Sequence, residues 1–338
     1  MKQRRPTPHQ QRGVAVIIAL LLTTLAITIV ASLFWQQQVQ VRLIENQRLQ
    51  LQKQWILLGA LDWAGLILRE DAKYSNVDTL NEPWAAPLAE TPLDQYVENG
   101  KANSDTSGTN LSGTISDAQA LFNLTNLCPN GIVDPVAVAT FGRLLTLLQI
   151  DPALAQTTAS QIALAPSSNM LPPLVQQASA VPATGLSQNA APVMPTTPVM
   201  ANSSNAQVMG YTQVEDLLAV PGFSLALLNQ LKPYVIFLPG STPVNINTAS
   251  AEVIAAMTGM SLSNADTLVV ARQTLPFSDL ANVSSRLPNN AFNVANMSVS
   301  SSYFLVNAKV HMNLARLDMQ ALLQRIGIAT RLLWIREF

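Results

Sequence analysis

A long uncharged, apolar segment near the N-terminus is the feature that most constrains how this chain can fold. No Asp, Glu, Lys or Arg occurs between Arg12 and Arg42, and the apolar core of the segment covers residues 14–35. These 22 residues reach about 33 Å as an α-helix, enough to cross a hydrocarbon core of roughly 30 Å. Secretory signal peptides have apolar regions of only about 7–15 residues, so we expect a transmembrane helix that is retained.

The charges on either side of this segment predict its orientation. Lys2, Arg4, Arg5 and Arg12 precede it, with no acidic residue among them. Because positive charge is retained on the cytoplasmic side, we expect the N-terminus in the cytoplasm and the bulk of the chain across the membrane. After residue 13 the chain carries 15 Lys and Arg against 20 Asp and Glu. That part therefore lacks the basic surplus that is typical of nucleic-acid-binding proteins.

The side chains that catalysis most often uses are scarce. The sequence contains two histidines, His9 and His311, and a single cysteine, Cys128. It has no G-x-S-x-G, H-E-x-x-H or P-loop motif, and Cys128 has no histidine near it in the sequence. We therefore expect no enzyme, no catalytic residue, no metal ligands and no cofactor.

The junction between the basic leader and the apolar segment is specific. Gly13 separates the last basic residue from the first apolar one, Val14. This arrangement resembles the processing site of type IV prepilins. The resemblance implies that the prepilin peptidase cuts after Gly13 and that the new amine of Val14 is methylated. Most members of the pilin superfamily carry Glu at the fifth mature position, where this chain has Ile18.

The helix is predicted to continue beyond the span to about Lys73. Ile44, Leu51, Trp55 and Leu58 recur at helical spacing, and no proline occurs until Pro83. The part from Trp55 to Leu68 is apolar enough to require a cover, so we expect it to pack on a sheet.

Two sequence phrases further along identify the family. FNLTNL at residues 122–127 and FGRLLTLLQIDP at 141–152 both resemble segments of protein K of the type II secretion system, the pseudopilin family that lacks the glutamate. Residues 109–115 and 120–127 are predicted to form a β-hairpin. Residues 303–313, 315–324 and 328–336 alternate as expected for antiparallel strands.

A second resemblance points to nucleic acid. Thr248 is predicted to cap a helix over 249–257, which a turn at Gly259 joins to a helix over 263–272. This sequence pattern resembles the helix-hairpin-helix module of competence-type DNA-binding proteins. Residues 241–290 contain only two basic residues, Arg272 and Arg286, against three acids, so they lack the positive charge that phosphate binding needs. A structural hairpin is the favoured interpretation.

The protein K resemblance implies an α+β fold. A pilin-like N-terminal membrane-spanning helix would pack on a small antiparallel sheet, with a large inserted all-α domain that contains a helix-hairpin-helix, sterile-alpha-motif-like (SAM-like) unit. The expected segments are a prepilin leader (1–13), a transmembrane segment (14–35), a periplasmic stem helix (36–75), the first part of the core with the hairpin (76–130), the inserted helical domain with a low-charge loop at about 166–207 (131–290), and C-terminal strands (291–338).

The same resemblance implies the function. It predicts a minor pseudopilin of the bacterial inner membrane, with its bulk in the periplasm, at the tip of the pseudopilus. Its implied partners are the I and J pseudopilins, the prepilin peptidase, the inner-membrane secretion platform, secreted substrates and the outer-membrane channel, with no nucleic acid. A competence-type DNA receptor and a minor pilin of a type IV pilus remain alternatives.

The sequence differs from the family in the segment where family members bind calcium. Members often carry an acidic loop after the LLxLDP helix, and this loop binds calcium. Residues 152–214 here contain no Asp or Glu, although calcium prefers several carboxylates among six to eight oxygens. We expect the calcium site to be lost.

Overall fold

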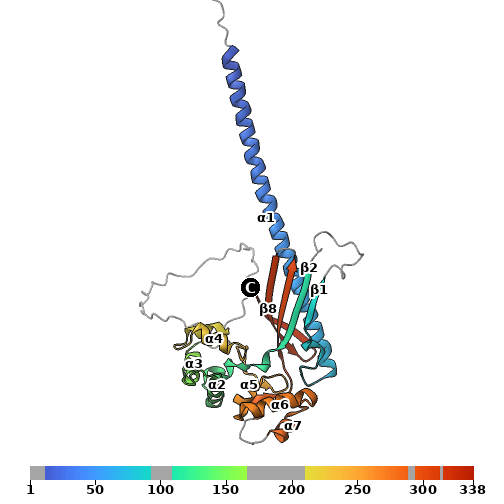
Figure 1. The fold of residues 1–338 in the computed structure, drawn as a ribbon, viewed down its shortest axis with the longest axis vertical. Helices are drawn as coiled ribbons and strands as arrows, with labels where there is room; N and C mark the ends of the chain where they lie inside the picture. Colours follow the sequence, from blue (N-terminus) through green and yellow to red (C-terminus); the bar gives the residue numbers. More distant parts are fainter. Residues whose placement is uncertain (1–11, 93–108, 166–209, 288–293, 313–314) are drawn as a thin grey trace, which may run out of the picture.

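A single long helix dominates the molecule. The computed structural model describes residues 12–92, 109–165, 210–287, 294–312 and 315–338. Helix α1 runs without a break from Arg12 to Tyr74 and stands away from the body of the protein over its first half (Figure 1). The predicted continuation of the helix to about Lys73 is confirmed, as no proline or glycine pair interrupts it.

The second half of α1 lies against a five-stranded antiparallel sheet with the strand order β1-β2-β7-β8-β9. The three C-terminal strands predicted from the alternation are confirmed. β2 and β7 are neighbours although almost two hundred residues separate them, and Asp117 at the end of β2 pairs with Phe304 at the start of β7. The strands are β1 (Leu88–Pro92), β2 (Thr109–Asp117), β7 (Tyr303–Met312), β8 (Ala315–Ile326) and β9 (Ala329–Glu337).

All the described elements that lie between β2 and β7 in the sequence form a part that we call the inserted unit. Figure 1 places α6 and α7 at the end of the molecule opposite the free end of α1. The elements are η3 (Ala118–Ala120), β3 (Phe122–Asn123), η4 (Leu124–Leu127), η5 (Pro129–Gly131), α2 (Pro135–Leu147), α3 (Ala153–Leu164), η7 (Val214–Ala219), α4 (Leu225–Leu231), β4 (Val235–Ile236), β5 (Val244–Asn245), α5 (Ala251–Thr258), α6 (Leu262–Thr274), α7 (Leu280–Arg286), η8 (Val294–Asn296) and β6 (Met297–Ser298).

The α1–sheet part and the inserted unit each have apolar cores of their own. Between α1 and the sheet, Leu57, Leu61 and Leu68 pack against side chains of β7 and β8. Trp84, in η1 (Pro83–Ala85), closes this core against Phe304 with an edge-on ring contact. Each fully buried Leu side chain stabilises the fold by about 1.5–3 kcal/mol. The inserted unit has its own cores, built around α2 and α4 and around α5 and α6.

The predicted hairpin of residues 109–115 with 120–127 is wrong. β2 pairs with β1 and β7, whereas Phe122 and Asn123 form the short β3, which pairs in parallel with β4. Asn123 explains the difference, because its side-chain oxygen accepts from the backbone N–H groups of Thr125 and of Leu238, which lies 115 residues after Asn123. This side chain turns the chain away from β2 and attaches it to the inserted unit.

Two further expectations need correction. Ser250, and not Thr248, caps α5, by accepting from the backbone N–H of Val253. The inserted unit is not all-α either, because β3–β4 and β5–β6 are parallel two-residue pairs within it. The α+β class itself is confirmed. Most of the predicted leader and the whole low-charge loop at 166–207 lie outside the described residues.

Candidate functional site

The first half of α1 is apolar and fully exposed. The most apolar 18-residue window of the stretch Val16–Ile44 has a mean hydropathy of 2.7, and none of that window is buried in the protein. Gly13 and Val14 lie in the first turn of α1, and Ile18 follows on the same exposed helix. An uncovered apolar surface of this length fits a single-pass membrane anchor.

The stem beyond the span has two apolar faces, and only one is covered. Leu57, Leu61, Ala64 and Leu68 face the sheet and are buried. The stripe singled out from the sequence lies on the other side, where Trp55 is 72% exposed. The other exposed members of that stripe are Ile44, Leu51 and Leu58. The sheet therefore covers a different face of α1 from the one that carries this stripe.

A buried polar network connects the sheet to the inserted unit at the end of β2. One carboxylate oxygen of Asp117 accepts from the side chains of Asn245 and Thr248, at 3.0 and 2.6 Å. The same oxygen accepts from the hydroxyl of Ser301, which lies just before β7. Asn245 also donates to the backbone oxygen of Asp78. All five residues are less than 10% exposed, so these bonds form away from water.

The network extends to the end of α1 through Arg325 of β8. Its guanidinium donates to Asp71, in the last turn of α1, at 3.0 Å and to Asp78 at 2.6 Å. It also lies over the ring of Phe304, with 4.8 Å between the charged carbon and the ring centre. We call the network from Asp117 to Asp71 the polar joint, since it ties α1, the sheet and the inserted unit together.

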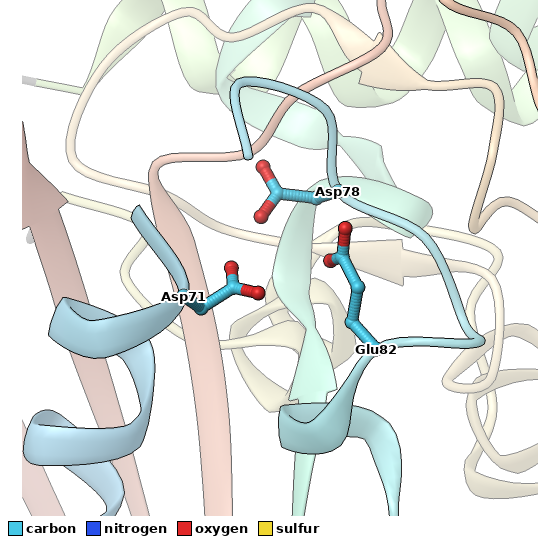
Figure 2. Close-up of side chains that lie close together, drawn as sticks. All are labelled: Asp71, Asp78 and Glu82. Atoms are coloured by element: carbon cyan, nitrogen blue, oxygen red, sulfur yellow. The ribbon is translucent and has the colours of Figure 1, made fainter. Parts of the chain in front are cut away.

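Three carboxylates meet at the α1 end of the polar joint. Figure 2 shows Asp71, Asp78 and Glu82 turned toward one another, and their nearest oxygens lie within 4.8 Å. Such a group could hold a cation, but Arg325 already bridges Asp71 and Asp78. Glu82 accepts from the indole N–H of Trp84 at 2.7 Å. The arrangement is therefore a buried ion-pair network with more acids than cations.

This surplus of negative charge changes the protonation of the joint. Burial, together with the nearby charges of Glu82 and Asp78, raises the pKa of Asp71 to about 6. Burial also raises the pKa of Asp117 to about 6, although its hydrogen bonds with Ser301 and Thr248 oppose the shift. Both groups gain protons in mild acid.

The helical hairpin offers little to a phosphate. α5 and α6 meet at a bend of 119°, and Gly259 ends α5 with a left-handed φ of 73°. Arg272 of α6 is 5% exposed, and its guanidinium donates to the backbone oxygen of Ile246. This arginine holds the hairpin against β5 and does not face solvent. Cys128 is buried as well, and burial raises the pKa of its thiol, so it is not a reactive nucleophile.

Comparison with protein families settles the family. Two models described as Type II secretion system (T2SS), protein K match residues 120–240 and 244–300, together more than half of the chain. The chain belongs to this family. It is a minor pseudopilin of type II secretion.

Relatives in the protein K family match along nearly the whole chain. The protein K of Pseudomonas aeruginosa is 28% identical over 324 residues, which cover 93% of this chain and 89% of the relative. That of Pectobacterium carotovorum is 25% identical, with 94% of each chain covered. The fold resembles a chain of the GspK-GspI-GspJ complex from enterotoxigenic Escherichia coli, with a TM-score of 0.63 at 20% identity over 87% of this chain.

Membership of the protein K family does not test the predicted processing site. Gly13, Val14 and Ile18 lie near one another because they are close in the sequence of one helix. Their proposed roles in cleavage, methylation and assembly stay predictions. The polar joint was missed by sequence reasoning. Its one sequence signal is the polar segment VNINTAS, which contains Asn245 and Thr248, and this segment by itself predicts only a helix cap at Thr248.

Proposed function

We propose that this minor pseudopilin caps the periplasmic pseudopilus and helps to start its assembly. The family match carries this proposal. The position of the inserted unit supports it, because this bulky unit lies at the end of the molecule farthest from the anchor (Figure 1). A subunit with such a unit at its distal end obstructs stacking of another subunit above it. Ile18 fits the same position, since it lacks the carboxylate that would pair with the amine of a subunit above.

Processing and orientation form the second part of the proposal. The prepilin peptidase cuts between Gly13 and Val14, the Val14 amine is methylated, and the helix stays in the bacterial inner membrane with its N-terminus cytoplasmic. The exposed apolar stretch Val16–Ile44 supports this, because it begins directly after the predicted cut. The other segments of the chain then form the periplasmic part.

The partners are the I and J pseudopilins, in the manner of the complex whose GspK chain the fold resembles. The inner-membrane platform, secreted substrates and the outer-membrane channel are further contacts of the same assembly. The role is structural and not enzymatic. The α5–α6 pair with its turn at Gly259 serves as the helix-hairpin-helix, SAM-like part of the inserted unit. The burial of Arg272 argues against a DNA receptor.

The residues present do not fit the calcium site of the family. Four acids lie beside the segment where the family has its acidic loop, and local contacts occupy each of them. Asp134 caps α2, and Asp151 accepts from the backbone N–H of Ala153, the first residue of α3. Asp216 accepts from the backbone of residues 212 and 213, and Glu215 pairs with Lys232 at 2.8 Å. We infer that calcium is not part of this protein.

Co-purification tests the proposed function. The full-length protein with a C-terminal tag should retain the I and J pseudopilins of its own secretion system when membranes are solubilised in mild detergent. Deletion of its gene should stop the export of folded proteins across the outer membrane. Unchanged secretion, together with purification free of other pseudopilins, would rule the proposal out. A gel shift with duplex DNA at low salt tests the receptor alternative, and we expect no binding.

A further inference from the structure

Two adjoining pockets on the inserted unit form one cleft. Their volumes are about 280 and about 300 Å³, and Pro129 and Ser241 line both of them. One wall comes from η4 and η5, and the other comes from the loop of residues 239–243, which precedes β5. We call this the loop cleft. Among the described residues that line it, Asp134 is the one charged residue, so the loop cleft suits an uncharged occupant.

The walls of the loop cleft are held in place by side-chain hydrogen bonds. The amide nitrogen of Asn126 donates to the backbone oxygen of Thr242 at 2.8 Å, and its side-chain oxygen accepts from the backbone N–H of the same residue at 3.0 Å. Asn123 donates to the backbone oxygen of Gly240 at 2.7 Å. A cleft whose shape is already set loses little conformational entropy when an occupant enters it.

The first pocket offers an aromatic surface and free hydrogen-bonding groups. The ring of Tyr211 stacks on Phe237, with 6.2 Å between the ring centres, and both rings line the pocket. The side chains of Asn130 and Ser241 are exposed there and, within the described part of the chain, make no hydrogen bond. Polyproline II helices bind in aromatic-lined grooves of this kind, because their backbone has no internal hydrogen bonds and its carbonyl oxygens can accept from such donors.

The sequence contains a segment with the matching chemistry. Pro192, Pro195 and Pro198 recur at every third residue, and a polyproline II helix has three residues per turn. P-x-x-P spacing is typical of segments that aromatic grooves recognise. Residues 152–214 contain no Asp, Glu, Lys or Arg, so this segment carries no charge for which the loop cleft lacks a partner.

The described chain ends at the loop cleft on both sides of this segment. Ala165, the last residue described after α3, and Gly210, the first residue described before η7, both line the first pocket. The shorter connection, residues 199–209, can extend to about 36 Å at about 3.3 Å per residue. The segment is therefore able to return to the pocket beside which it is attached. Attachment at both ends also gives it a high effective concentration there, so contacts of modest affinity are sufficient.

We propose that residues 192–198 bind in the loop cleft of their own chain, with prolines against the ring of Tyr211 and backbone carbonyl oxygens accepting from Asn130 and Ser241. This contact holds the low-charge part of the insertion against the inserted unit without calcium. The proposal is independent of the proposed function, because it concerns contacts within one chain.

Site-specific crosslinking in the full-length protein tests the proposal. In a Cys128→Ser background, Ser241→Cys carries a maleimide with a short diazirine arm in the loop cleft. Ser160→Cys carries the same probe on the exposed face of α3, five residues before Ala165 in the sequence but outside the cleft. After illumination and digestion, we expect Ser241→Cys to join residues 192–198 of its own chain, with about tenfold more product than Ser160→Cys.

A second set of variants separates binding from mere attachment. Replacement of Pro192, Pro195 and Pro198 by Ala keeps the length of the chain but removes the repeat, so the crosslink from Ser241→Cys should fall about tenfold. The matched control replaces three prolines outside the repeat, Pro172, Pro173 and Pro182, by Ala and should leave the crosslink unchanged. Equal melting temperatures of the two triple variants show that both are folded.

Several outcomes would overturn the proposal. Equal product from the two probes would do so, as would adducts spread evenly over residues 166–209. Adducts to another molecule, which denaturing gels reveal by their larger mass, would show that the loop cleft receives a partner and not its own chain. An undiminished crosslink after loss of the three repeated prolines would show that the repeat is not what binds.

Discussion

Arg325 of β8 places its Nη1 atom 3.0 Å from the carboxylate oxygen of Asp71, in the last turn of α1. The two residues lie 254 positions apart in the sequence. Their contact fixes the end of the stem helix to β8, the second strand after the inserted unit. The side chains of both residues are less than 10% exposed, so removal of one partner leaves the other charge buried.

Loss of this guanidinium should therefore be costly. Arg325→Met leaves the carboxylates of Asp71 and Asp78 without their cation, and we expect the free energy of unfolding to fall by about 3–5 kcal/mol. Urea unfolding of the detergent-solubilised protein, followed by tryptophan fluorescence, measures the change. Arg316→Met is the matched control, because Arg316 pairs with Asp318 on the exposed surface of the same strand. It should change stability little. Equal effects would contradict the role of the polar joint.

The polar joint should also make stability depend on pH. The pKa values of Asp71 and Asp117 are raised from 3.8 to about 6, so the folded protein holds protons that the unfolded chain has already released. The free energy of unfolding should therefore fall as pH rises from about 4 to about 6 and level off above that. Melting curves between these values test the sign. Asp71→Asn should flatten the profile, and a melting temperature that rises with pH in the unmodified protein would contradict it.

We expect processing after Gly13 to make the mature protein begin at Val14. Intact-mass spectrometry of the membrane-extracted protein should show the loss of residues 1–13, with one methyl group added. Gly13→Val places a branched side chain at the cut and should leave the precursor intact in the inner membrane. A strain without prepilin peptidase serves as the control, since it should accumulate the same precursor. Met1 retained in a strain with active peptidase would contradict the pseudopilin processing that we propose.

Calcium should not stabilise this protein. A ligand at a hundredfold its dissociation constant adds about 2.7 kcal/mol to the free energy of unfolding, which raises the melting temperature by several degrees. We expect equal melting temperatures in millimolar calcium and in chelator, with magnesium as the control for ionic strength. A rise specific to calcium would show that the acids beside α3 and η7 are recruited into a site after all.

The local elements of the fold could largely be predicted from the sequence. The uncharged run and the strand alternation after Tyr303 each depend on neighbouring residues, and the structure confirms the helix and the strands that they predict. The error at Phe122 has a long-range cause. Asn123 is held by partners more than a hundred residues away, and no local pattern reveals this.

The faces of α1 show a second limit of sequence reasoning. Leu57 and Leu61 alternate with Trp55 and Leu58, so the stem is apolar on both sides, and periodicity alone does not say which face meets the sheet. The polar joint was invisible for a related reason. Asp71, Asp117 and Arg325 are unremarkable surface residue types until the fold buries them together.

The chain leaves the sheet at the end of β2 and returns to it at the start of the neighbouring strand, β7. This connection has a mechanical consequence. Asp117 and Phe304 are paired, so the inserted unit is attached through two adjacent strand ends and not through one linker. A thrust along α1 reaches it through the sheet as compression over a broad base. A sideways force is resisted by both attachments and by the bonds of Asn245 between them. The inserted unit and the stem helix are therefore coupled and respond to force as one rigid body.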